Sequence, residues 1–114
     1  MDLALSSTAE ASRTVVRVAG EVDVYTAPAL RRFLEEQILR GCRDLVVDLS
    51  EVTFLDSTGL GVLVGRLRQM RMKGGQLRLV GPADRVVKVL AITGLDRVFD
   101  IAPTLEAIDR TDGL

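Results

Sequence analysis

The sequence predicts a single α/β domain spanning residues 1–114, in which β-strands alternate with α-helices. Short runs of β-branched and aliphatic residues alternate with segments whose apolar residues recur at helical spacing. Glycine or proline stands at most junctions between these segments. The 114 residues fit one domain. We therefore expect a mixed sheet of four to five strands with about four helices and right-handed crossovers.

The N-terminal part predicts a hairpin followed by a helix. Residues 3–7 form a weak strand and the valine-rich residues 14–19 a stronger one, and the two can pair antiparallel. Residues 20–23 are predicted as a loop. Thr26 suits a helix N-cap, with Pro28 in the first turn. This helix is predicted to end at Arg40 and Gly41, a cation followed by a glycine.

The second half predicts a buried strand and three further helices. Residues 45–49 are nearly all apolar, which suits a central strand covered on both faces. After Asp56 a helix is predicted to run to about Lys73. The remaining elements are expected as strand 77–80, helix 83–92, strand 98–101 and helix 103–108, with a frayed tail at residues 109–114.

Composition excludes several kinds of chemistry. Histidine is absent, which excludes Ser-His-Asp and Cys-His nucleophile pairs and any histidine-ligated metal. Cys42 is the single cysteine, which excludes an intrachain disulfide and a cysteine-rich zinc site. Since the chain also lacks a recognisable acid–base pair, we predict that it is not an enzyme, and we expect no cofactor or metal.

Charge and hydropathy limit the classes of partner that we expect for this chain. Fifteen Lys and Arg against 16 Asp and Glu give a net charge of -1, which argues against binding a nucleic-acid backbone. Aromatic residues are only 4%, which argues against base stacking. The longest stretch without charged residues, 57–65, is far shorter than a membrane span. No basic segment follows Met1, so we expect a cytoplasmic protein.

The helix after Asp56 has two unequal faces. One face is apolar and predicts core positions at Leu60, Leu63, Val64, Leu67 and Met70. The opposite face is uncharged and small, and contains Thr58, Gly61, Val62, Gly65, Gln69 and Met72. Each helical glycine costs about 1 kcal/mol relative to alanine, so something should offset that cost. Two interpretations remain open: close packing on a neighbouring helix of the same domain, or a flat surface on which another protein docks.

Ser57 stands where the strand becomes the helix. Taken alone, it is a natural N-cap, and Asp56 can precede or share the capping. A nucleophilic role is not supported, because the Gly-x-Ser-x-Gly elbow is absent and no histidine exists. A nucleotide cradle is not supported either, because no lysine lies nearby.

A family resemblance extends over nearly the whole chain. Asp-Ser-Thr-Gly-Leu-Gly at residues 56–61, preceded by an apolar strand, resembles the signature of STAS domains, and most closely that of the anti-anti-sigma factors (anti-sigma factor antagonists) of bacteria. Three further matches are Gly-Glu-Val-Asp at 20–23 followed by Thr26 and Ala27, Gly-Gly at 74–75, and Thr-Gly-Leu at 93–95.

The resemblance implies a regulatory role. In that family the serine after the aspartate, here Ser57, is phosphorylated by a partner that is both anti-sigma factor and serine protein kinase. The unphosphorylated protein binds this partner and frees a sigma factor, and a metal-dependent serine phosphatase resets the phosphorylated form. The expected partner-binding residues are Asp23, Tyr25, Asp56, Thr58, Gly59, Gly61, Val62 and Gly65. The alternative is a STAS scaffold, or an accessory domain of a transporter or lipid-trafficking complex, that acts by constitutive protein–protein contact.

Overall fold

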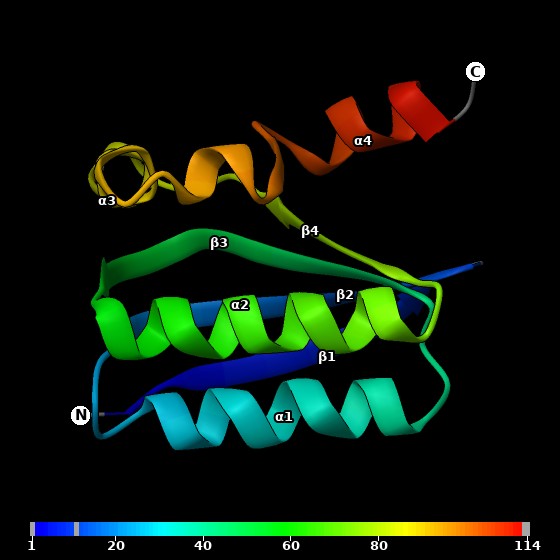
Figure 1. The fold of residues 1–114 in the computed structure, drawn as a ribbon, viewed down its shortest axis with the longest axis horizontal. Helices are drawn as coiled ribbons and strands as arrows, with labels where there is room; N and C mark the ends of the chain where they lie inside the picture. The colour runs from blue at the N-terminus through cyan, green and yellow to red at the C-terminus, as the bar shows by residue number, and fades with distance from the viewer. Residues whose placement is uncertain (1, 11, 113–114) are drawn as a thin grey trace.

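The computed structural model describes residues 2–10 and 12–112 as a five-stranded mixed sheet with helices on both faces (Figure 1). The sheet order is β1-β2-β3-β4-β5, with β1 antiparallel to β2 and all other neighbours parallel. The strands are β1 (Ala4–Glu10), β2 (Arg13–Val22), β3 (Asp44–Leu55), β4 (Gln76–Val80) and β5 (Asp100–Ala102). The helices are α1 (Ala27–Leu39), α2 (Ser57–Met72), α3 (Asp84–Ile92) and α4 (Leu105–Asp112), with a 3-10 turn, η1 (Leu95–Arg97). The predicted fold class and hairpin are confirmed.

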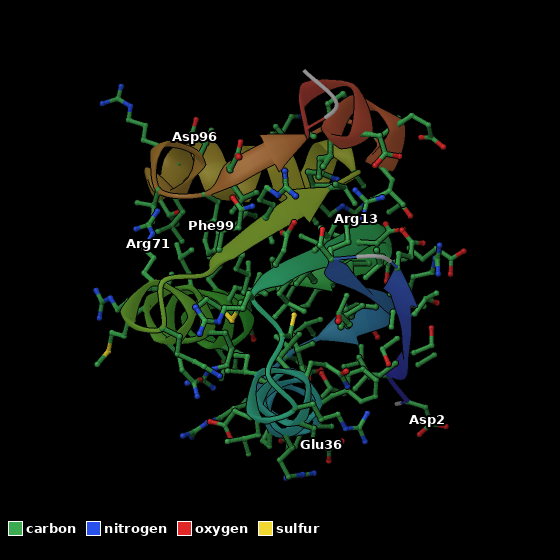
Figure 2. All side chains as sticks on the ribbon, turned by 90° about the vertical axis from the view of Figure 1, so that its right-hand side faces the viewer. Asp2, Arg13, Glu36, Arg71, Asp96 and Phe99 are labelled. Carbon is green, nitrogen blue, oxygen red and sulfur yellow. The ribbon has the colours of Figure 1, made fainter. Side chains whose placement is uncertain are left out.

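The sheet separates a large core from a small one. Neighbouring residues of β2 and β3 point to opposite faces, so Val16 and Val47 enter the large core while Val15 and Val46 enter the small one. Helices α1, α2 and α3 bury their apolar sides in the large core. Ile108 of α4 closes the small core on the other face. Figure 2, turned by 90° from Figure 1, shows α4 in red, apart from α1 and α2.

Helices α1 and α2 lie side by side along the sheet (Figure 1). Leu30, Leu34 and Ile38 of α1 recur at helical spacing and are fully buried. The predicted core face of α2 is confirmed at four positions, because Leu60, Leu63, Leu67 and Met70 are buried, whereas Val64 is half-buried. This leaves the opposite side of α2 facing outward.

The predicted ends of two strands are wrong. β2 continues through the expected loop to Val22, and β3 continues past the expected end at 49, through Ser50 and Glu51, to Leu55. The register of β2 against β3 shifts at two places, and these irregularities let the two strands stay paired along their length. One shift lies beside Gly20, whose φ is +117°. The polar side chains of Ser50 and Glu51, which follow the predicted apolar strand, are exposed, so they do not interrupt the backbone pairing of β3.

The C-terminal elements shift by a few residues. β5 begins at Asp100 rather than at 98, because the 3-10 turn occupies residues 95–97. Helix α4 starts at Leu105 and continues to Asp112, beyond the expected end at 108. Residues 113 and 114 of the expected frayed tail lie outside the described residues.

The topology brings two loops to one edge of the sheet. Val22 and Leu55 are partners in register at the carboxyl ends of the parallel strands β2 and β3. The N–H of Asp56 donates to the carbonyl oxygen of Val22 at 3.2 Å, which ties the start of α2 to the end of β2. The loop that enters α1 and the loop that enters α2 are therefore neighbours.

Candidate functional site

The N-terminus of α2 is capped by Asp56. One carboxylate oxygen of Asp56 accepts the backbone N–H groups of Thr58 at 2.9 Å and Gly59 at 3.2 Å. These are two of the N–H groups that a helix start leaves without partners. The negative charge of Asp56 also lies at the positive end of the helix dipole.

The prediction that Ser57 is the N-cap is wrong by one residue. Ser57 is the first helical residue, because Asp56 has the extended backbone of a cap and already supplies the capping oxygen. The side chain of Ser57 is exposed, and its hydroxyl makes no hydrogen bond within residues 2–10 and 12–112. The structure therefore presents an uncommitted hydroxyl at the end of a helix.

Gly59 fixes the angle at which α2 leaves the sheet. It is buried, and a Cβ built on it would lie 2.5 Å from Leu55 Cδ1 and 2.6 Å from Val22 Cγ1. Real Cβ atoms do not approach so closely. Only glycine lets the first turn of α2 sit directly on the ends of β2 and β3, so Gly59 packs inside the site rather than on its surface.

The loop between β2 and α1 is held by Asp23. Its Oδ1 accepts the N–H of Tyr25 at 2.9 Å and of Thr26 at 3.0 Å. These bonds, that from Thr26 foremost, lower the pKa of the Asp23 carboxyl below its ordinary value of 3.8. Thr26 occupies the N-cap position of α1 as predicted, but its hydroxyl makes no capping bond and instead donates to the carbonyl oxygen of Glu21 at 2.8 Å.

This loop presents apolar surface to solvent. Tyr25 is 87% exposed and Val24 is 58% exposed. The tight turn around Asp23 holds both side chains outward. Val24 was not among the sequence-predicted residues, although an apolar residue inside a polar turn was a signal that could have identified it.

The outward side of α2 bears on one of the two interpretations of its glycines, that of packing on a neighbouring helix. A Cβ built on Gly61 or on Gly65 meets nothing within 4 Å. Among residues 2–10 and 12–112, no neighbouring helix therefore packs against either glycine, so intradomain packing does not explain them. Thr58 is exposed and Val62 is half-buried beside α1. The structure thus gathers Asp23, Tyr25, Asp56, Ser57 and the start of α2 at one edge, with Gly61, Val62 and Gly65 extending away from it.

The structure shows neither a metal centre nor a membrane helix in the part of the chain it describes. No group of three or more metal-ligating side chains occurs among residues 2–10 and 12–112. Within the same ranges, no helix is both long enough and apolar enough to traverse a bilayer.

Comparison with known proteins identifies the fold family. The family model described as STAS domain matches residues 5–108. The chain belongs to the STAS domain family. The anti-sigma-B factor antagonist of Bacillus subtilis is 42% identical to it over 91 residues, which cover 80% of this STAS chain and 83% of the relative.

Solved structures agree with this assignment. An anti-sigma factor antagonist from Mycobacterium paratuberculosis is 34% identical, with a TM-score of 0.83 and coverage of 93% of this STAS chain and 90% of the other. The Bacillus cell fate determinant SpoIIAA in its phosphorylated form is 27% identical, with a TM-score of 0.71 and coverage of 96% and 99%. The names of these relatives describe regulatory factors, which agrees with the prediction that this chain is not an enzyme.

Proposed function

We propose that this STAS protein is an anti-sigma factor antagonist that binds an anti-sigma factor with serine kinase activity, and that phosphorylation of Ser57 switches this binding off. One observation carries the proposal. The Ser57 hydroxyl is exposed at the first residue of α2 and makes no hydrogen bond to any residue that the structure describes, because Asp56 performs the capping. The relatives named as anti-sigma factor antagonists support the class of partner.

The surface we assign to the partner surrounds Ser57. It combines the exposed Val24 and Tyr25 with the small, uncharged side of α2 at Thr58, Gly61, Val62 and Gly65. Exposed apolar groups beside a flat helix surface suit reversible docking of another backbone. Three further residues position this surface without contacting the partner. Asp23 and Asp56 hold the two loops, and Gly59 lets α2 sit on the sheet.

Phosphorylation changes this surface by charge. A phosphate adds about −1.5 to −2 charges at pH 7. The N–H groups of Thr58 and Gly59 already bond to Asp56, so the phosphate on the neighbouring residue meets a carboxylate rather than free donors. The phosphate therefore remains in the interface, where like-charge contacts and lost hydration cost several kcal/mol. A cost of about 3 kcal/mol lowers affinity roughly a hundredfold.

The family resemblance implies the remainder of the cycle. The unmodified protein sequesters the anti-sigma factor, which frees a sigma factor in the cytoplasm. A metal-dependent serine phosphatase removes the phosphate and restores binding. The single STAS domain suffices for both states, because the switch needs no large conformational change.

Phosphorylation of matched variants tests the proposal. Wild-type protein, Ser57→Ala and Thr58→Ala are incubated with ATP and the anti-sigma factor of the source organism, and intact mass is measured. We expect one added phosphate on wild type and on Thr58→Ala, and none on Ser57→Ala. A phosphate found on Ser57→Ala would show that another residue is the phosphate acceptor. If wild-type protein binds the anti-sigma factor stably but acquires no phosphate, the result would favour the constitutive scaffold instead.

A further inference from the structure

A groove of about 350 Å³ lies between α1 and α2 and begins beside the Ser57 loop. Its apolar lining comes from Ala27, Pro28 and Val62. Thr58, the residue that follows Ser57, lines one end, and Arg31, Arg32 and Glu35 line the α1 side.

The groove carries an excess of positive charge. Glu35 Oε1 lies 3.3 Å from Arg31 Nε and 3.3 Å from Arg66 Nη1, so one carboxylate serves two guanidinium groups. Arg32 is exposed and makes no ion pair with any residue the structure describes. The groove lining thus holds two guanidinium groups and one carboxylate, and that carboxylate is also paired with Arg66 outside the lining, although the whole chain has a net charge of -1.

The dimensions suit a short peptide segment. Along α1 the lining extends from Ala27 to Glu35, which is roughly 12 Å at the helical rise of 1.5 Å per residue. That length accommodates about four residues of extended chain at roughly 3.3 Å each. The floor of Ala27, Pro28 and Val62 offers space for an aliphatic side chain, and Arg31 and Arg32 stand where carboxylates of the same segment would lie.

We infer that this groove binds an acidic segment of the anti-sigma factor, with one aliphatic side chain inserted between the helices and carboxylates paired with Arg31 and Arg32. The inference rests on the proposed function, because the groove adjoins the partner surface at Thr58. It adds a second contact that lies along α1, away from the phosphorylated hydroxyl. Electrostatic attraction at such a rim acts mainly on the association rate and its salt dependence.

Charge reversal at Arg32 tests the groove. The probe is the purified anti-sigma-B factor of Bacillus subtilis, whose antagonist is 42% identical to this chain. Arg32→Glu removes no intramolecular ion pair, so its fold should persist, which thermal unfolding verifies. Lys88→Glu is the matched control, because it makes the same change in net charge at an exposed position on α3, outside the groove.

At low salt we expect Arg32→Glu to bind at least tenfold more weakly than wild type, and Lys88→Glu to bind within twofold. The difference should shrink at 1 M salt, where the Debye length is about 3 Å. Equal affinities of Arg32→Glu and Lys88→Glu for the probe would overturn the inference that the groove binds the anti-sigma factor. Ser57→Asp, measured in the same series, separates the two proposals: its loss of binding supports the switch whatever Arg32 does. If wild type does not bind the probe, both proposals fall.

Discussion

Alanine substitution of three glycines in α2 should change stability in opposite directions. Gly59, Gly61 and Gly65 belong to one helix, so each change adds the same methyl group to the same kind of backbone. In a helix interior, glycine is about 0.8–1.0 kcal/mol less favourable than alanine. The sign of the result then depends on what the new methyl group meets.

At Gly59 the added Cβ would lie 2.5 Å from Leu55 Cδ1 and 2.6 Å from Val22 Cγ1, both in the core. Overpacking of this kind costs about 1–3 kcal/mol. The helix-propensity gain is smaller in the first turn, so we expect Gly59→Ala to be destabilised by about 1–2 kcal/mol net. At Gly61 and Gly65 the Cβ meets nothing within 4 Å, so each alanine should stabilise by about 0.5–1 kcal/mol.

Urea unfolding of the three variants measures these differences directly. A change of 1 kcal/mol corresponds to a Tm shift of roughly 4–8 °C in a domain of about this size. The same variants should separate stability from function, since Gly61→Ala and Gly65→Ala raise a methyl group into the proposed docking surface and should bind the anti-sigma factor more weakly. A stabilised Gly59→Ala, or a destabilised Gly61→Ala, would refute the assignment of these glycines.

Three further changes address the cap and the loop. Asp56→Ala removes the α2 cap and should lower the free energy of unfolding by about 1 kcal/mol in urea titrations. Because the folded pKa of Asp23 lies below 3.8, its contribution to stability is complete above that value and is lost as pH falls through the folded pKa. Asp23→Asn should therefore flatten the pH dependence of thermal unfolding below about pH 4, and an unchanged profile would contradict the turn. Tyr25→Ala should leave Tm nearly unchanged, since the side chain is 87% exposed, but should weaken partner binding more than tenfold in calorimetry.

Periodicity and glycine placement were enough to predict the order of strands and helices. They did not predict the length of β3, which continues past residue 49 through the polar residues Ser50 and Glu51. A strand whose side chains are exposed can remain paired through its backbone, and this pairing depends on β2, whose paired residues lie 31 to 33 positions earlier in the chain. The residues of β3 alone do not indicate which distant strand pairs with it, so the length of β3 could be determined only from the structure.

The site was predicted in outline but not in detail. Asp56 and Ser57 are both good caps, and nothing local decides which of them occupies the cap position. The structure decides it, because the end of β3 places Asp56 in extended backbone. The roles of the three glycines were also indistinguishable in sequence, since close contact at Gly59 and open space at Gly61 depend on which elements surround each position.

The most direct test of the switch compares the affinities of two forms of the wild-type protein for the same anti-sigma factor. One form is unmodified, and the other carries a single phosphate on Ser57 at full occupancy, verified by mass spectrometry. Titration calorimetry should give an affinity about a hundredfold lower for the phosphorylated form, which corresponds to roughly 3 kcal/mol. Equal affinities for the two forms would contradict the account, because the phosphate would then lie outside the interface.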